Sequence, residues 1–337
     1  MTLEIDGETT FAYHGLKTTQ TTHLETVKSL IQEFLEDIQF DRNLPFIKDH
    51  ELEAAVWTYF KSLNMGQKLE SSVHDVLKLS ATLTHQAYTQ LPFENKVLCT
   101  IQNLYMFLID DIADDFMEEL RCFGQNFILN IHHNHPLLRG YDTHLRYLSR
   151  YYGPQRHSTI VKSNLDYVNG RIIEHEMDTA RFKFPPGSKL MPMFLRTKVG
   201  ASETMVSMLF PKAAYPEEEN LMRYLPAVAE LMMFTDMTND ILSYYKEFVL
   251  RDEKTNFVAN FAETHDMSHL DVLRHLVSYA PQLVKSVFRM LHGQQDLLDT
   301  VQNYFNGYIM MFTAHRRYHL VELFEDEGYL MPYDEDS

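Results

Sequence analysis

Apolar residues recur three and four positions apart along most of this chain, and that spacing is what most limits its fold. Residues three and four apart lie on one face of an α-helix, so the pattern predicts helices that bury one side. The sequence has only 12 Gly and 12 Pro in 337 residues, and no evenly spaced short strands with turn signals. We therefore predict an all-α protein. Helices are expected near residues 22–35 and at 53–63, 69–88, 92–116, 142–152, 160–178, 191–210, 217–248, 269–298 and 301–324.

The predicted helices form one domain with loose ends. Residues 1–20 are polar and Thr-rich and are predicted to be a mobile arm, whereas residues 326–337 are predicted to be an acidic tail. The domain between them is residues 21–325. Breaks between helices are expected at Pro136, Gly153-Pro154, Pro185-Pro186-Gly187, Pro211 and Pro281.

Composition excludes several classes of partner. The formal net charge is −17, with 30 Lys and Arg against 47 Asp and Glu, which argues against nucleic acid. No apolar stretch approaches the roughly 18 residues that indicate a membrane span. Cys99 and Cys122 form neither a metal-ligand spacing nor a disulfide framework, so we expect a reduced, cytoplasmic protein. An anionic ligand would need cations or a local basic cluster to bind.

Asn239, Ser243 and Glu247 place an amide, a hydroxyl and a carboxylate at intervals of four residues. Four residues advance an α-helix by slightly more than one turn, so these side chains share one face over about 12 Å. Mg²⁺ prefers such hard oxygen ligands and usually shares substrate phosphates. A polar helix face is the alternative, but a match this complete seldom arises by chance. The segment therefore predicts a magnesium site.

A second cluster of oxygens, Asp110-Asp111-Ile112-Ala113-Asp114-Asp115, directly follows an apolar run that ends at Ile109. On a helix Asp110 and Asp114 share a face, where like charges repel by a few tenths of a kcal/mol. Carboxylates at the rim of a core are costly unless a cation neutralises them. The alternative is a solvated acidic patch. The apolar run before it favours a second set of metal ligands.

Basic residues lie where they can bind the anion that such ions would hold. Arg196 stands four residues before Gly200, Lys246 lies inside the Asn/Ser/Glu segment, and Arg317-Tyr318 closes the last strong helix. Each basic residue alone is more often a surface residue. Their joint placement in an acidic chain predicts a common anion site.

Together these motifs resemble those of class I terpene cyclases, and specifically the fungal trichodiene synthase family. The resemblance rests on the aspartate-rich segment, the Asn239/Ser243/Glu247 triad, Arg196 and Arg317-Tyr318, and extends over about residues 54–325. The triad is the specific signal, because an aspartate cluster alone is shared with prenyl-chain-elongating synthases.

The resemblance implies a single-domain, class I terpenoid synthase bundle of helices around a deep apolar cavity. It implies an Mg²⁺-dependent enzyme, with three ions at the cavity mouth holding the diphosphate of a linear isoprenoid. The expected reaction is that of a sesquiterpene cyclase, which ionises farnesyl diphosphate, releases diphosphate and forms a cyclic hydrocarbon or alcohol. A homodimer is also expected, since dimers are common among such folds.

Roles for individual residues follow from the same resemblance. Asp110 is the expected principal metal ligand, Asp111 and Asp114 are accessory, and Asn239, Ser243 and Glu247 are expected to chelate a further ion. Diphosphate oxygens are expected to contact Arg196, Lys246, Arg317 and Tyr318. The expected catalytic set is Asp110, Asp111, Arg196, Arg317 and Tyr318. Helix faces add Asn103, Phe107 and Met311 as candidate substrate-binding residues in the cavity.

Two residues depart from what a trichodiene synthase should have. Met311 stands where Trp is expected, and Asp236 adds an acid one turn before Asn239, so the product is left open. Two other functions compete with the cyclase. A chain-elongating prenyl diphosphate synthase of the same fold would carry a second aspartate-rich motif in place of the Asn/Ser/Glu triad. A non-catalytic helical binding protein would not need an intact set of ligands.

Overall fold

The computed structural model describes residues 8–251, 253 and 255–324, with side chains from residue 23 onward, and every regular element in this part of the chain is helical. The α-helices are α1 (Glu8–Asp37), α2 (His50–Ser62), α3 (Gln67–Ala87), α4 (Phe93–Ile112), α5 (Met117–Arg121), α6 (Phe123–Leu129), α7 (Pro136–Tyr147), α8 (Pro154–Ala180), α9 (Met191–Val199), α10 (Ser202–Ser207), α11 (Glu217–Tyr224), α12 (Val228–Leu242), α13 (Phe257–His265), α14 (His269–Met290), α15 (Gln295–Ala314) and α16 (Leu320–Leu323). Short 3₁₀ turns are η1 (Ala113–Phe116), η2 (Leu148–Arg150), η3 (Leu225–Ala227) and η5 (Arg316–Tyr318), and η4 (Tyr245–Leu250) is π-helical. The prediction of an all-α fold is confirmed.

The two ends of the chain are only partly described. Helix α1 begins at Glu8, upstream of residue 22, where the helical pattern of the sequence becomes regular. Residues 1–7 and the predicted acidic tail at 326–337 lie outside the described residues. The proposed mobile arm and tail therefore remain predictions.

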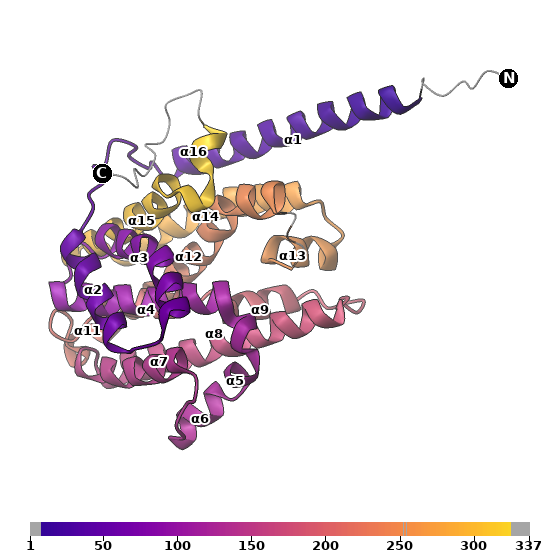
Figure 1. Cartoon of the computed structure of the whole chain (residues 1–337). Helices are drawn as coiled ribbons and strands as arrows, with labels where there is room; N and C mark the ends of the chain where they lie inside the picture. Colours follow the sequence, from indigo (N-terminus) through magenta and orange to yellow (C-terminus); the bar gives the residue numbers. More distant parts are fainter. Residues whose placement is uncertain (1–7, 252, 254, 325–337) are drawn as a thin grey trace.

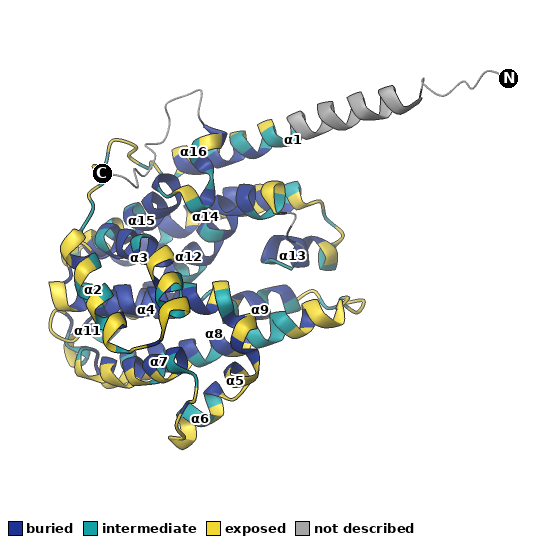
Figure 2. Ribbon diagram, viewed as in Figure 1, coloured by how far each residue is buried: buried dark blue, intermediate teal, exposed yellow. Residues whose placement is uncertain are grey.

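The helices pack as one bundle with a continuous apolar interior (Figures 1 and 2). Helix α3 packs between α4 and α15, and α12 packs against α14 and α10. Helix α8 lies along the side of the bundle, where it contacts α9 and α10. The arrangement brings α4 and α12, which carry the two predicted oxygen clusters, into the same half of the molecule.

Gly307 lets α15 approach α3 more closely than any other residue would allow. A Cβ atom at Gly307 would lie 2.1 Å from the carbonyl carbon of Gln86 and 2.3 Å from the amide nitrogen of Ala87. Because these are backbone atoms at the end of α3, they cannot turn away as a flexible side chain can. The contact fixes the height of α15, and hence of Met311 one turn later, relative to the rest of the bundle.

The helix boundaries differ from the predicted ones at several places, and α5, α6 and α13 were not predicted. Pro281, a predicted break, lies inside α14, where Val277, Ala280 and Val284 remain buried in the bundle. The predicted helix at 191–210 is divided at Gly200-Ala201, since Ala201 has a left-handed φ of 47° that ends α9 and starts α10. The predicted helix at 217–248 is interrupted by η3 and changes to π geometry after Ser243.

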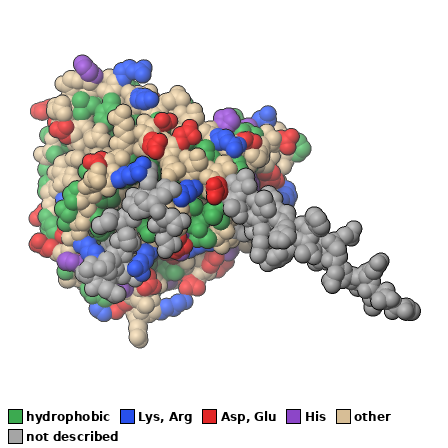
Figure 3. Space-filling view, turned by 90° about the horizontal axis from the view of Figure 1, so that it is seen from above, with side chains coloured by type: hydrophobic (Ala, Val, Ile, Leu, Met, Phe, Trp, Pro, Cys, Tyr) green, Lys and Arg blue, Asp and Glu red, His purple; other side chains and the backbone are tan. Residues whose placement is uncertain are grey.

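The surface is mixed in charge on the face that Figure 3 shows, where basic side chains are scattered among acidic ones. None of the described helices combines the length and apolar character needed to cross a membrane. Both cysteines are free, with Cys99 buried and Cys122 exposed.

Candidate active site

A cavity of about 140 Å³ lies between α4, α12 and α15, and one residue of each predicted oxygen cluster lines it. Asp110 on α4 and Asn239 on α12 both line it, together with Arg196 from α9 and Tyr318 from η5. The other predicted residues at this cavity are Asn103, Phe107 and Met311. Its remaining walls are mainly apolar and aromatic, from Leu83, Met106, Tyr167, Val199, Gly200, Met205 and Tyr308.

The aspartate-rich segment is not one continuous helix. Helix α4 ends at Ile112, and Asp114 falls in the tighter turn η1. Because the turn rotates the chain, Asp114 leaves the face of Asp110: it is absent from the cavity wall, 82 % exposed and paired with His175 at 2.9 Å. The expectation that Asp110 and Asp114 share a face was wrong for this structure.

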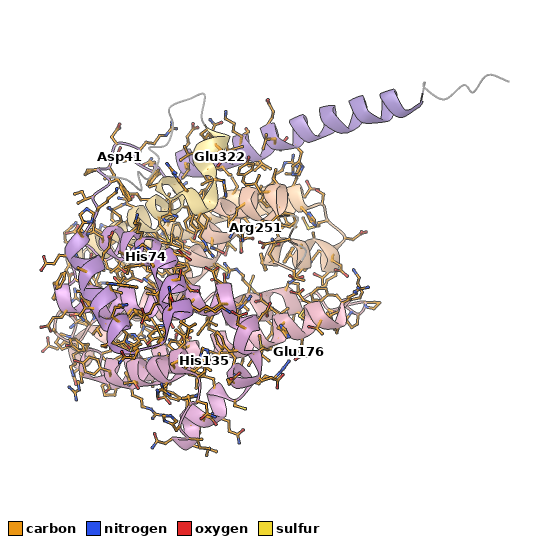
Figure 4. All side chains as sticks on the ribbon, viewed as in Figure 1. Asp41, His74, His135, Glu176, Arg251 and Glu322 are labelled. Atoms are coloured by element: carbon orange, nitrogen blue, oxygen red, sulfur yellow. The ribbon has the colours of Figure 1, made fainter. Side chains whose placement is uncertain are left out.

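The chain beyond this segment is fastened to α8. Arg121 on α5 pairs with Glu176 on α8, and Figure 4 places Glu176 at the end of the bundle where α5 lies. The pair between His175 and Asp114 is one residue away on the same helix. These two contacts hold the acidic turn against α8.

The Asn/Ser/Glu segment keeps its spacing of four residues across the change of helix type. The Ser243 amide donates to the Asn239 carbonyl and the Glu247 amide to the Ser243 carbonyl, both at 2.9 Å. The Ser243 hydroxyl also donates to the Asn239 carbonyl at 2.6 Å, which leaves its lone pairs available. Glu247 accepts a hydrogen bond from Asn256 at 3.1 Å. The three side chains thus follow one another at successive turns, as the sequence predicts.

Arg196 is buried and directed at α12. Its Nε donates to Asp240 at 3.0 Å, and its Nη2 donates to the Asp236 carbonyl at 2.8 Å and to the Asn239 side-chain oxygen at 3.2 Å. Burial lowers the pKa of Arg196, but the carboxylates of Asp240 and Asp236 outweigh it and raise the pKa above its usual value. Arg196 therefore stays cationic beside the cavity.

Gly200 leaves room for the Asp236 carboxylate next to Arg196. A Cβ at Gly200 would lie 2.1 Å from Asp236 Oδ1 and 2.7 Å from Arg196 Nη1. The hydroxyl of Ser202, at the start of α10, donates to the other oxygen of Asp236 at 3.1 Å. The extra acid noted in the sequence is thus a partner of Arg196 at the break between α9 and α10.

Arg317 on η5 and Lys246 on η4 lie next to residues that line the cavity. Arg317 makes a two-pronged contact with Asp111, at 3.0 and 2.6 Å, and its guanidinium carbon lies 6.0 Å from the centre of the Phe107 ring. Lys246 is 8 % exposed, pairs with Glu247 at 3.3 Å and lies 5.6 Å from the centre of the Tyr318 ring. The four predicted diphosphate-binding residues therefore surround the cavity, although Lys246 and Arg317 do not line it.

The electrostatics also place residues of both clusters near the same groups. Burial raises the pKa of Tyr318, and the carboxylates of Glu247, Asp110 and Asp111 raise it further against the opposing effect of Arg317. Burial likewise raises the pKa of Glu253, with Glu247 and Asp110 adding to the increase. Charges from both walls thus act on the same groups.

The donors present fit Mg²⁺. No three His, Cys, Asp or Glu side chains within residues 23–324, where described, are gathered tightly enough to chelate a metal by themselves. An ion here would have to use the amide of Asn239 and the hydroxyl of Ser243 as well as carboxylates. Amide, hydroxyl and carboxylate oxygens are the hard donors that Mg²⁺ accepts. Asp110, Asn239, Ser243 and Glu247 would be the residues that hold it.

Several residues of the site were not assigned from the sequence. Tyr308 lies one turn before Met311 on α15, so its helical spacing was a usable signal. Asp240 lies inside the Asn/Ser/Glu segment, but its role as a partner of Arg196 depends on a contact between distant helices. Arg171 on α8, which pairs with Asp110 at 3.5 Å, carried no signal in its local sequence.

A larger groove lies beside the site but contains none of the predicted residues. Its volume is about 600 Å³, and it is lined by α13 and by Tyr244 and Phe248, which flank Ser243 and Glu247 in sequence. Asp110, Asn239 and Arg196 line the smaller cavity. The predicted residues that do not line it are Asp111, Asp114, Ser243, Lys246, Glu247 and Arg317.

Solved structures that are similar in fold to this chain include terpene synthases. A linalool/nerolidol synthase from Streptomyces clavuligerus superposes with a TM-score of 0.61, covering 80% of this chain and 98% of that chain, at 13% identity. The similarity defines the fold as that of the class I terpenoid synthases and confirms the predicted fold class.

The family follows from the sequence comparison. The chain belongs to the trichodiene synthase (TRI5) family, whose sequence model matches residues 31–330, and it is therefore a terpene synthase. An (E)-beta farnesene synthase of Metarhizium brunneum is 24% identical over 82% of this chain and 83% of its own length. A monoterpene synthase of Postia placenta is 27% identical over 88% of this chain and 86% of its own length.

Proposed function

We propose that this terpene synthase is an Mg²⁺-dependent sesquiterpene cyclase that ionises farnesyl diphosphate and cyclises the resulting cation. The observation that carries the proposal is the meeting of Asp110, Asn239, Arg196 and Tyr318 at one largely apolar cavity. Oxygen ligands on two walls suit metal-bound diphosphate, and the apolar interior suits an isoprenoid chain. The name of the farnesene synthase relative supports a 15-carbon substrate.

Different residues would act on the diphosphate and on the hydrocarbon chain of the substrate. Mg²⁺, when bound, supplies charge that stabilises the departing diphosphate. Arg196, Lys246, Arg317 and Tyr318 would add N–H and O–H donors to its oxygens, which lowers the barrier to charge separation. Rings such as Phe107, Tyr167 and Tyr308 would face the carbocation and attract it by about 0.5–2 kcal/mol each.

The cavity must widen to take this substrate. Pockets for small molecules usually measure about 300–1,000 Å³, whereas this cavity is about 140 Å³. Two ion pairs lie at the border of the cavity, Arg317 with Asp111 and Arg171 with Asp110. If the aspartates bound Mg²⁺ and Arg317 bound diphosphate instead, these pairs would separate and the cavity would open. Closure over bound substrate would then exclude water from the cation.

The test is a product assay. The pure protein is incubated with geranyl, farnesyl and geranylgeranyl diphosphates and Mg²⁺, and the hexane extract is analysed by gas chromatography and mass spectrometry. We expect a cyclic 15-carbon hydrocarbon or alcohol from farnesyl diphosphate. A folded protein that yields no terpene from any substrate would refute the proposal, and a product from geranyl diphosphate alone would move it to ten-carbon chains.

The metal assignment makes a separate prediction. Asn239→Ala and Glu247→Ala should each reduce turnover by at least about 100-fold, because loss of one stabilising interaction in the transition state costs about 3 kcal/mol or more. Asn306→Ala on α15, away from the cavity, serves as the matched control with wild-type turnover. Circular dichroism checks the fold of each variant. Wild-type turnover in both Asn239→Ala and Glu247→Ala would remove these residues from the metal site.

The proposal also covers the number of metal ions, the cellular location and the oligomeric state of the enzyme. Three Mg²⁺ ions and a cytoplasmic location are proposed, the latter supported by two free cysteines. A homodimer is proposed as well. Exposed Ile128, Leu129 and Ile131 at the end of α6 offer an apolar surface for a second copy.

A further inference from the structure

Arg171 links the aspartate-rich segment to α8 through both its side chain and its backbone. The Nη1 atom of Arg171 lies 3.5 Å from Asp110 Oδ1, and its Nη2 atom donates to the Asp110 backbone carbonyl at 3.3 Å. Nη1 also donates to Glu174, one turn further along α8. The side chain of Arg171 is 24 % exposed, against 49 % for Asp110. One guanidinium is thus shared between two carboxylates at the border of the cavity.

The contact belongs to a regular attachment of α8 to α4. The Tyr167 hydroxyl donates to the Met106 carbonyl at 2.7 Å, and four residues later on both helices Arg171 donates to the Asp110 carbonyl. Asp110 lies in the last turn of α4, where carbonyl groups have no partner within the helix. A cation at this end also offsets the negative pole of the helix, which a carboxylate alone would reinforce. Arg171 is therefore placed by the packing of the two helices.

Arginines pair with oxygens in both predicted metal-binding segments. Arg196 donates to the Asn239 side chain, Arg317 to Asp111, and Arg171 pairs with Asp110. Arg196 and Arg317 are already expected to bind diphosphate, so their contacts have an evident second partner. Arg171 has no such assignment, although its partner Asp110 is the expected principal ligand.

We propose that Arg171 is a positioning residue that competes with Mg²⁺ for the Asp110 carboxylate and thereby sets how much metal the enzyme needs. The inference rests on the proposed function. A carboxylate oxygen that pairs with a guanidinium has less capacity for a metal ion, and the nearby positive charge opposes the approach of a second cation. Glu174 shares the guanidinium and so weakens its hold on Asp110.

The competition makes two predictions of opposite sign. Arg171→Gln frees Asp110 and removes a positive charge, so the Mg²⁺ concentration that half-saturates the site should fall several-fold. Glu174→Gln leaves Asp110 as the remaining acidic partner of Arg171, so the same concentration should rise. Arg171→Lys keeps the charge and should stay near the wild type. A residue that only supports the fold would not shift Mg²⁺ demand in opposite directions.

The measurement uses the full chain and inorganic pyrophosphate. Thermal unfolding is followed at fixed pyrophosphate and constant ionic strength while Mg²⁺ is titrated, and the midpoint of the rise in Tm is recorded. Arg223→Gln is the matched control, because it removes an arginine that pairs with Asp296 at 2.7 Å away from the cavity. It should lower Tm without moving the Mg²⁺ midpoint. Arg171→Gln should lower Tm in the absence of Mg²⁺ and move the midpoint as well.

The outcomes separate the two proposals. If the wild type shows no stabilisation by Mg²⁺ with pyrophosphate, the proposed function and this inference both fail. If the wild type responds but Arg171→Gln has an equal or higher midpoint, only the inference is overturned. Should Arg171→Gln fail to fold, a midpoint for Glu174→Gln at or below that of the wild type overturns the inference in the same way.

Discussion

The side-chain oxygen of Asn239 already has a partner, since Arg196 donates to it at 3.2 Å. A carbonyl oxygen has two lone pairs, so it can accept this bond and still offer the other lone pair to a metal ion. Asp236 and Asp240 keep the guanidinium in place through two further contacts. A shift of Arg196 toward an anion in the cavity would therefore change its hydrogen bond to the side-chain amide of Asn239.

His144 provides a test of burial at a single residue. It is 3 % exposed, its Nε2 has no hydrogen-bond partner among the residues that the structure describes, and burial lowers its pKa from 6.5 to about 3. Between these values the unfolded chain binds a proton that the folded chain does not, so the free energy of unfolding falls as pH falls. The loss should be about 1.4 kcal/mol per pH unit below 6.5.

The measurement compares denaturant unfolding of the wild type and His144→Phe between pH 6.5 and 5. The variant should lack this part of the pH dependence, because it has no group to protonate. His292→Phe, at an exposed position after α14, is the control and should keep the wild-type slope. Equal slopes in the wild type and His144→Phe would show that His144 accepts a proton in the folded protein.

For individual residues, the sequence predicted which ones line the cavity better than it predicted which residues they pair with. Asp110, Asn239, Arg196 and Tyr318 were predicted from their spacing and resemblance, and all four line the cavity. The pair of Arg196 with Asp240 and that of Arg171 with Asp110 join residues on different helices. Helical periodicity gives the face of a side chain but not the angle at which two helices cross, so these pairs lay beyond it.

Among the elements, α15 and α3 make a contact that leaves no room for an added side chain at Gly307. A methyl group at Gly307 would lie within 2.3 Å of three backbone atoms of Gln86 and Ala87. Gly307→Ala should therefore lower the free energy of unfolding by about 3 kcal/mol, at the upper end of the usual cost of overpacking.

Gly124→Ala on α6 is the matched control for this change. A Cβ there meets no atom of the described part of the chain within 4 Å, and Ala favours a helix over Gly, so stability should rise by about 0.5–1 kcal/mol. Urea unfolding of the two variants measures both effects. A Gly307→Ala protein as stable as the wild type would mean that α15 can slide along α3.

Helices as units were largely predictable, whereas some of their interruptions were not. The apolar pattern located α3, α8 and α14, because their buried faces repeat over many turns. The predicted breaks at Pro136, Gly153-Pro154, Pro185-Pro186-Gly187 and Pro211 all fall between helices or at the first residue of one. Pro281, however, lies inside α14, and the break after α9 falls at Gly200-Ala201. At the latter break the Asp236 carboxylate fills the space beside Gly200, which is a contact between helices that the local sequence does not show.

For the molecule as a whole, the two walls of the cavity should act as one unit. Asp110 and Asn239 lie on different helices but border the same 140 Å³ cavity. If both help to hold one metal–diphosphate group, loss of either wall removes much of the benefit of the other. The loss in pyrophosphate affinity for Asp110→Ala/Asn239→Ala should then be smaller than the sum for the single variants by more than about 0.5 kcal/mol.

Calorimetric titration of pyrophosphate at high Mg²⁺ measures this coupling. Asp110→Ala combined with Asp299→Ala is the control pair, because Asp299 lies near the start of α15 and away from the cavity. That pair should be additive. Additive losses for Asp110→Ala and Asn239→Ala would indicate that the two walls bind separate ligands.

The small size of the cavity has a consequence for inhibition. Apolar cavities of about 150 Å³ accommodate a molecule the size of benzene. A compact aromatic compound that filled the 140 Å³ hollow would favour the narrow conformation over the wide one. Such a compound would need no resemblance to an isoprenoid and no negative charge. It would inhibit by stabilising the narrow conformation. Substrate would then displace it only at the additional free-energy cost of widening the cavity.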